Sequence, residues 1–270
     1  MILLPTDLIN LLSTYFCSRV NAKLRTINHH FAKAIKPPPL HIICPSLKFP
    51  NLKYSIQFIE RLYKQAVDVP KPQIWLTSEN IITAGWISIH CPLTIVGHPD
   101  KLTNVLGAGF LIQSSNFEKS YFNLSHCIVH SKLGQGIFAQ GPLKLKLTHV
   151  TVVASKSSGI LIRENIEGKL KNCNVYNSTA MGLFVSSSRV ACNNCIITGN
   201  KWSGVCAVAG SIITLQNSII QNNGEKTMTG CFDLKASKNN DSIFLDGINV
   251  QQRKDYILTK GGNGKISKLH

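Results

Sequence analysis

The chain has 270 residues, of which 44% are hydrophobic and 16% are charged. This composition argues against an intrinsically disordered chain, and the length is enough for a large buried core. The 29 Lys and Arg residues outnumber the 13 Asp and Glu residues, so the net charge is +16. Such an excess is compatible with an anionic partner or with a solvated basic face. Because no zinc-finger, helix-turn-helix or RNA-recognition signature is present, nucleic acid is a disfavoured partner.

Residues 1–36 predict a small helical module. Its apolar residues recur at spacings of three and four, and Pro5 stands where a helix can begin. The start lacks the basic region of a signal peptide, and no apolar run is long enough to span a membrane. Together with nine cysteines, an odd number, this predicts a cytoplasmic or nuclear protein whose cysteines are reduced. Three prolines at 37–39 then predict a linker over 37–50.

Residues 51–72 predict a capping helix and the entry to the next domain. Between 51 and 67 one face of the helix is apolar, with Leu52, Ile56, Ile59, Leu62 and Tyr63.

Residues 73–255 carry an internal repeat. Each copy can be anchored on one residue, and the anchors Cys127, Val150, Cys173, Cys195 and Ser218 lie 23, 23, 22 and 23 residues apart. Apolar residues stand three before and two after each anchor, apart from Cys192 in one copy. A glycine follows nine residues after four anchors: Gly136, Gly159, Gly182 and Gly204. A repeat in the low twenties is typical of a solenoid.

The spacing of two between apolar residues indicates strands, and each copy predicts one coil of three short strands. The residue before each anchor is His126, His149, Asn172, Asn194 or Asn217. In stacked coils these side chains would hydrogen-bond along a ladder. The glycine column suggests a corner with positive φ. The predicted fold is mainly β, a parallel β-helix of about seven coils.

The repeat becomes irregular after Gln221. The segment Ser242–Val250 repeats the layout of Ser211–Ile219, which predicts one further coil after an insertion. Residues 256–270 are expected to be a C-terminal tail.

Two family resemblances follow from these segments. The helix, the strand Ile74-Trp-Leu-Thr-Ser and the run Cys91-Pro-Leu-Thr-Ile-Val-Gly97 resemble the opening of right-handed parallel β-helix domains, a superfamily that includes pectate lyases and non-enzymatic members. The pattern of residues 1–36 resembles an F-box, although Phe31 stands near the usual Trp. The resemblance implies binding to a Skp1-like adaptor and a cullin ligase through Leu4, Pro5, Leu8, Leu12, Val20 and Leu24. The alternative is that these residues only cap the β-helix.

An enzyme on polysaccharide is disfavoured. Lyases of this fold need acidic calcium ligands, and glycosidases need paired carboxylates. Between Lys101 and Gly224 the only acids are Glu118, Glu164 and Glu167. We therefore expect no catalytic residues, no metal and no cofactor. Cys192 and Cys195 form a CxxC, but without a second pair they read as core positions on either side of a turn.

Two surfaces of the coils are candidates for a protein partner. Alternate residues after the glycines would face outward as an apolar stripe of Phe138, Leu161, Phe184 and Cys206, unless another element covers it. Lys146 and Lys169 share one coil position, and Lys144 and Arg189 share another. This basic face would suit an acidic or phosphorylated segment, with a merely soluble face as the alternative. Together with these surfaces, the F-box resemblance implies a non-enzymatic receptor that recruits a protein to, or interferes with, a ubiquitin ligase. A scaffold without adaptor binding is the alternative.

Overall fold

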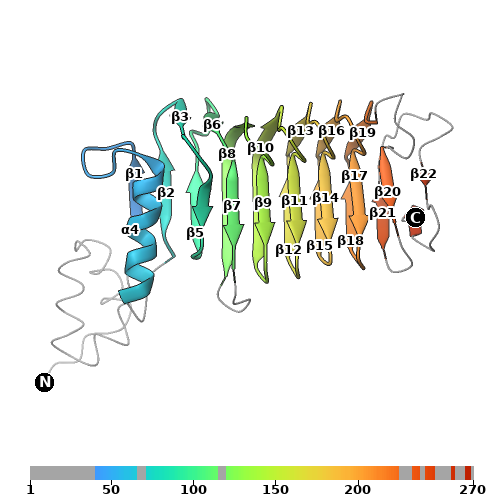
Figure 1. The fold of residues 1–270 in the computed structure, drawn as a ribbon, viewed down its shortest axis with the longest axis horizontal. Helices are drawn as coiled ribbons and strands as arrows, with labels where there is room; N and C mark the ends of the chain where they lie inside the picture. Colours follow the sequence, from blue (N-terminus) through green and yellow to red (C-terminus); the bar gives the residue numbers. More distant parts are fainter. Residues whose placement is uncertain are drawn as a thin grey trace, which may run out of the picture.

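The computed structural model describes residues 40–65, 71–114, 120–224, 233–237, 241–246, 257–258 and 265–268. Within them, short strands pair in parallel and stack along one long axis in the order of the chain. Figure 1 shows this stack, with the helix α4 (Leu52–Gln65) at its N-terminal end.

The strands form three faces. The first face consists of β1 (His41–Cys44), β2 (Gln73–Leu76), β5 (Leu93–Val96), β8 (Tyr121–Ser131), β10 (Lys144–Val153), β12 (Glu167–Lys171), β15 (Arg189–Asn193), β18 (Ile212–Gln216), β21 (Ser242–Asp246) and β23 (Lys265–Lys268). The second face consists of β3 (Asn80–Ile82), β6 (Thr103–Gly107), the second parts of β8 and β10, β13 (Asn174–Tyr176), β16 (Ile196–Thr198) and β19 (Ile219–Gln221). The third face is a separate sheet of β4 (Ile87–Ile89), β7 (Phe110–Gln113), β9 (Ile137–Gln140), β11 (Ile160–Arg163), β14 (Leu183–Ser186), β17 (Val205–Val208), β20 (Leu234–Ala236) and β22 (Ile257–Leu258).

Each turn contributes one strand to each face, as β11, β12 and β13 do. The third face has eight stacked strands among the described residues. The predicted parallel β-helix of about seven coils, with three strands in each coil, is therefore confirmed.

The core lies inside the coils, where equivalent residues stack on one another. The anchors are buried, and the positions three before them pair in the series Leu124, Leu147, Leu170, Cys192 and Leu215. Burying each large aliphatic side chain contributes about 1.5–3 kcal/mol relative to an exposed one. A repeat length of 22 or 23 residues keeps the equivalent apolar residues of every coil inside the core.

The corner between the first and second faces has positive φ at the residue before each anchor. His126, His149, Asn172, Asn194 and Asn217 have φ between 46° and 56°. Asn tolerates this region better than most residues because its short polar side chain bonds locally. The predicted ladder is present: Asn194 Nδ2 donates to Asn172 Oδ1 at 2.7 Å, and Asn172 Nδ2 lies 3.1 Å from His149 Nε2.

The prediction that the glycine column needs positive φ is wrong. Gly136, Gly159, Gly182 and Gly204 have no positive φ, but they have no room for a side chain. A Cβ on Gly136 would lie 2.2 Å from Val152 Cγ1, and one on Gly159 would lie 2.3 Å from Val175 Cγ1. Gly182 is packed in the same way against Ile197, and Gly204 against Asn223, so close packing against a side chain of the next repeat copy explains these glycines.

The predicted capping helix is present, and α4 buries Leu52, Ser55, Ile56 and Ile59 against the first coil. Asn51 caps it, since its Oδ1 accepts from the backbone nitrogen of Tyr54 at 2.8 Å. The prediction of a linker over 37–50 is wrong for His41–Cys44. This segment is strand β1, which buries Ile42 and Cys44 and pairs with β2.

The C-terminal expectations need two corrections. The further coil exists as β21, but Ser242 pairs with Ile212, one residue away from the predicted register. The reason is that Asp241, not Ser242, occupies the buried corner equivalent to Ser211. Residues 256–270 are not only a tail, because β23 pairs with β21 and Ile266 packs against the core.

Candidate partner-binding face

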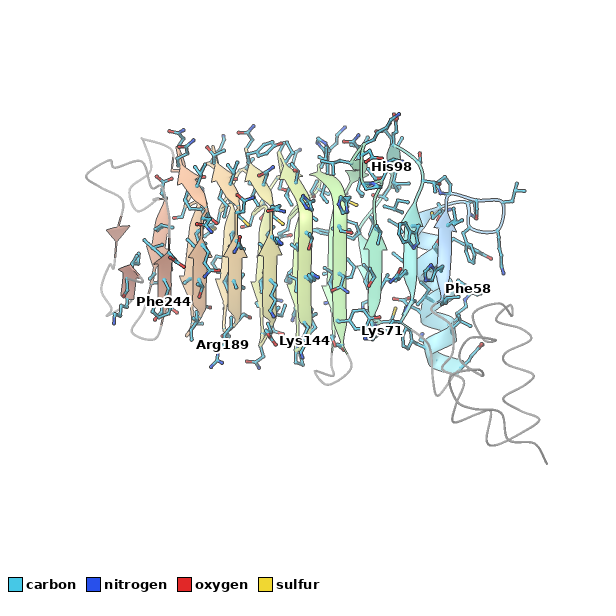
Figure 2. All side chains as sticks on the ribbon, turned by 180° about the vertical axis from the view of Figure 1, so that it is seen from behind. Phe58, Lys71, His98, Lys144, Arg189 and Phe244 are labelled. Atoms are coloured by element: carbon cyan, nitrogen blue, oxygen red, sulfur yellow. The ribbon has the colours of Figure 1, made fainter. Side chains whose placement is uncertain are left out.

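Five long cationic side chains lie together on the outside of the first face. Lys144 and Lys146 come from β10, Lys169 and Lys171 from β12, and Arg189 from β15. All five are exposed, because strand alternation places their neighbours Leu145, Leu147, Gly168, Leu170 and Val190 inside. Figure 2 labels Lys144 and Arg189 on this face, and we call the five residues the basic face.

The register brings the predicted residues together in columns that run across the strands. Lys146 pairs directly with Lys169. Lys144 and Arg189 share a column as expected, but Glu167 lies between them, paired with both. Sequence reasoning missed this role of Glu167, although it stands six residues before Cys173, as Lys144 stands six before Val150.

The charges on this face form a regular array. Neighbouring strands lie about 4.8 Å apart, and residues two apart on one strand lie about 6.6 Å apart. Like charges at these distances repel within the screening length of about 8 Å at physiological salt. With five cations around one carboxylate, the face has a net positive charge that an anionic partner would neutralise.

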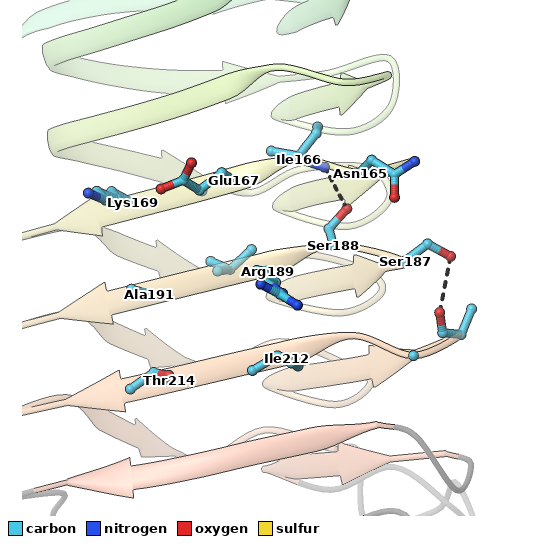
Figure 3. A pocket seen from close by; sticks show the side chains of 14 residues that line it. Asn165, Ile166, Glu167, Lys169, Ser187, Ser188, Arg189, Ala191, Ile212 and Thr214 are labelled. Carbon is cyan, nitrogen blue, oxygen red and sulfur yellow. Dashed lines mark hydrogen bonds between the residues drawn. The ribbon is translucent and has the colours of Figure 1, made fainter. Parts of the chain in front are cut away.

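A groove of about 740 Å³ begins beside the basic face. It crosses β12, β15 and β18 and reaches the corner to the third face (Figure 3). Its lining includes Lys169, Glu167 and Arg189, together with small side chains such as Ala191, Thr214 and Ser187. The groove exists because Ala191 and Thr214 continue the column of Lys146 and Lys169 with short side chains.

Hydrogen bonds fix the corner beside the groove. Ser187 Oγ donates to the carbonyl oxygen of Ala209 at 3.1 Å, and the backbone nitrogen of Ile166 donates to Ser188 Oγ at 3.1 Å (Figure 3). On the next coil, Asp241 Oδ1 accepts from the backbone nitrogens of Gly210 and Ser211 at 2.7 and 3.2 Å. The pairing between strands does not provide partners for these corner groups, and the side-chain hydrogen bonds do. The corner is thereby held in place, so the groove is preformed.

The predicted apolar stripe lies on the third face. Phe138, Leu161 and Phe184 pair in register and are partly exposed, and Leu111 extends the row. The prediction is wrong for Cys206, which is 1% exposed. Cys206 pairs with Lys235 of β20, and burial raises the pKa of its thiol to about 11.

A polar cluster lies at the edge of this stripe. The Arg163 guanidinium stands 4.9 Å from the centre of the Phe138 ring, and its Nη2 donates to Gln140 Oε1 at 2.8 Å. Gln140 Nε2 in turn donates to both Glu164 oxygens at 2.9 Å. The cluster borders a hollow of about 310 Å³ that Gln113 and His90 also line. Because its groups bond one another, it stabilises the corner.

The CxxC cysteines lie in the core, as expected. Cys192 and Cys195 are buried on either side of the Asn194 corner, and Cys173 lies beneath Cys195 on the neighbouring coil. In the described part of the chain, no group of three or more His, Cys, Asp and Glu residues could hold a metal ion. Within the same ranges, no helix is long and apolar enough to cross a membrane. The predicted adaptor-binding residues, Leu4 to Leu24, lie outside the described residues.

Comparison with known proteins identifies the class. Residues 101–243 match the family described as the right-handed beta helix region, and the chain belongs to that family. Among solved structures, the pectate lyase Pel9A is similar, with a TM-score of 0.53 and 12% identity over 86% of this chain and 76% of that chain. At this identity the similarity shows a shared fold. A comparison with curated proteins gives no match.

Proposed function

We propose that this protein recruits another protein without catalysing a reaction on it. The observation that carries the proposal is the in-register basic face beside a preformed groove. Its side chains stand on strands paired on both sides, so a partner would meet a rigid array of charges. Rigid presentation lowers the entropic cost of binding.

We propose further that the protein is a receptor of a Skp1-cullin-F-box-type ubiquitin ligase. This part of the proposal is supported by the F-box-like pattern of residues 1–36. Leu4, Pro5, Leu8, Leu12, Val20 and Leu24 would contact the adaptor, and the β-helix would hold the target. The receptor would promote ubiquitin transfer by proximity, or block it by occupying the ligase. A scaffold that binds proteins without an adaptor is the competing function.

A pull-down from a cell extract with the intact chain tests the receptor role. The Leu8→Asp, Leu12→Asp double variant should lose a captured Skp1-like adaptor and cullin. The matched control is Leu47→Asp, Ile82→Asp, which places the same new charges at two exposed positions, one in the loop after β1 and one in β3. Capture that survives Leu8→Asp, Leu12→Asp, or no capture by well-folded intact protein, would reject the receptor role and leave a scaffold.

A carbohydrate-active β-helix is the second candidate, because the fold is shared with a pectate lyase and because Arg163 and Glu164 stand beside a hollow. The intact protein should be incubated with pectate, with and without calcium, and the products analysed by mass spectrometry. New chain ends that disappear in an Arg163→Gln, Glu164→Gln variant would favour the enzyme over the recruiting protein.

A further inference from the structure

The groove on the first face has one charged wall and an uncharged floor. In one column, the long side chains of Lys146 and Lys169 are followed on the next two strands by Ala191 and Thr214. In the neighbouring column Arg189 is followed by Ile212. Lys169 and Arg189 therefore stand at the side where the hollow begins, and small or apolar side chains form its bottom.

The floor consists of short side chains on the outer surface of β15 and β18. Ala191 and Thr214 pair in register on β15 and β18, and the corner residues Ser187, Ala209 and Gly210 close one end. None of the residues that line the groove is aromatic. A chain lying here in extended form would run beside the cations, with its own side chains spaced like those of the strands below.

The cations are spaced to meet alternate residues of such a chain. Lys169 and Arg189 are the two cations that line the groove, on the neighbouring strands β12 and β15. Because Arg189 pairs with Glu167, Lys169 stands two positions further along the strand direction, about 6.6 Å. Negative groups at residues i and i+2 of an extended peptide have the same separation. Each would meet a cation at the distance of a charge-assisted hydrogen bond.

We propose that this groove binds an extended acidic or phosphorylated segment of the partner protein, with two negative groups separated by one residue. The inference rests on the proposed function, because it takes the occupant to be a protein. Two observations favour a peptide over a nucleic acid. The lining offers no aromatic ring for base stacking, and Glu167 interrupts the cations where a phosphate backbone would pass.

Glu167 gives the groove a selectivity element. It lies in the column between Lys144 and Arg189, so a negative group placed there would be repelled. The groove thus accepts a peptide with two negative groups separated by one residue, and it disfavours a peptide with an unbroken run of acidic residues. Removing the carboxylate should tighten the binding of anionic peptides in general and weaken the discrimination between them.

Fluorescence anisotropy with the intact protein tests the proposal. The probes are three labelled Gly-Ser peptides of one length: one with two phosphoserines separated by a glycine, one with glutamates at the same positions, and one with serines. The first two should bind and the third should not. Lys169→Gln, Arg189→Gln should weaken binding at least about tenfold, since it removes the charge-assisted hydrogen bonds to the two negative groups of the peptide.

The matched control is Lys156→Gln, Lys201→Gln, which removes two exposed lysines from a different corner. It should leave binding within about twofold, as expected for screened charges away from the site. Glu167→Gln should tighten binding of both anionic peptides. Circular dichroism should show the same fold for all variants, because the changed side chains are exposed.

Three outcomes would overturn the inference. Equal losses in the groove and control variants would mean that only net charge matters. Equal binding of the serine peptide would remove the role of charge. A short oligothymidylate that binds more tightly and displaces the phosphopeptide would assign the face to nucleic acid. Peptide binding without adaptor capture would retain the groove and reject the ligase role, whereas the reverse result would reject the groove alone.

Discussion

Gly159 lies so close to Val175 that a Cβ on the glycine would stand 2.3 Å from Val175 Cγ1. The same contact joins Gly136 to Val152 and Gly182 to Ile197 at the equivalent places of other coils. Gly159→Ala should therefore force the coil apart and lower the free energy of unfolding by about 1–3 kcal/mol.

Urea denaturation measures this loss. The control is Gly85→Ala, because Gly85 has nothing within 4 Å of a new Cβ and no positive φ. A Gly159→Ala variant as stable as Gly85→Ala would show that the coil adapts without cost.

At Asn172, in the ladder of corner residues, the loss of stability should depend on which residue replaces the asparagine. Asn172 has φ of 53°, and its amide group contacts His149 and Asn194. Asn172→Ala and Asn172→Gly both lose these contacts, but only alanine has a Cβ that disfavours the left-handed region. The free energy of unfolding of Asn172→Ala should therefore be about 1–2 kcal/mol lower than that of Asn172→Gly, as measured by thermal or urea unfolding.

Asn174→Ala and Asn174→Gly, two residues further on in β13, provide the comparison. Asn174 has no positive φ, so there the glycine variant should be the less stable one. The same order at both positions would contradict the strain argument.

Stability should fall when the solution becomes mildly acidic. Burial lowers the pKa of His126 below its ordinary value of 6.5, and the neighbouring His149, whose ring is stacked 5.1 Å away, lowers it further. The unfolded chain thus takes up a proton at higher pH than the folded chain. The free energy of unfolding should decrease as pH falls from about 6.5 toward the folded pKa, and this contribution should be constant above that window.

The His126→Asn variant tests the source of this effect, because Asn occupies the same place in three other coils. Its melting temperature should depend less on pH between about 5 and 7. Some dependence should persist, since burial and Lys132 also lower the pKa of His130. An unchanged slope would exclude His126 as the titrating group.

Thiol labelling should report unfolding of the coils. Burial raises the pKa of Cys127 to about 12 and that of Cys206 to about 11, so both stay protonated and covered at pH 8. Iodoacetamide should modify them only at the urea concentrations that unfold the protein, as mapped by mass spectrometry. Rapid labelling of Cys127 in the folded protein would show that the core opens locally.

Much of the fold could be predicted from the sequence because the repeat is recognisable from the spacing of residues along the chain. The anchors and their apolar neighbours had to lie on one side of each strand, and stacking then followed from the period. The columns of Lys146 with Lys169 and Lys144 with Arg189 followed from the same spacing. The register of β21 did not, because an insertion of different length precedes it and a buried Asp241 replaces the corner serine.

The sequence by itself thus determined the coil, its inward columns and the basic residues that share a face. Each of these depends only on how many residues separate a side chain from the anchor of its repeat copy. Only the tertiary structure decided that positive φ falls on the Asn column, that glycines make room for valines and that Cys206 is covered. It also decided that a groove opens where Ala191 and Thr214 follow two lysines. These features depend on the lengths and packing of side chains across several coils, which no single repeat contains.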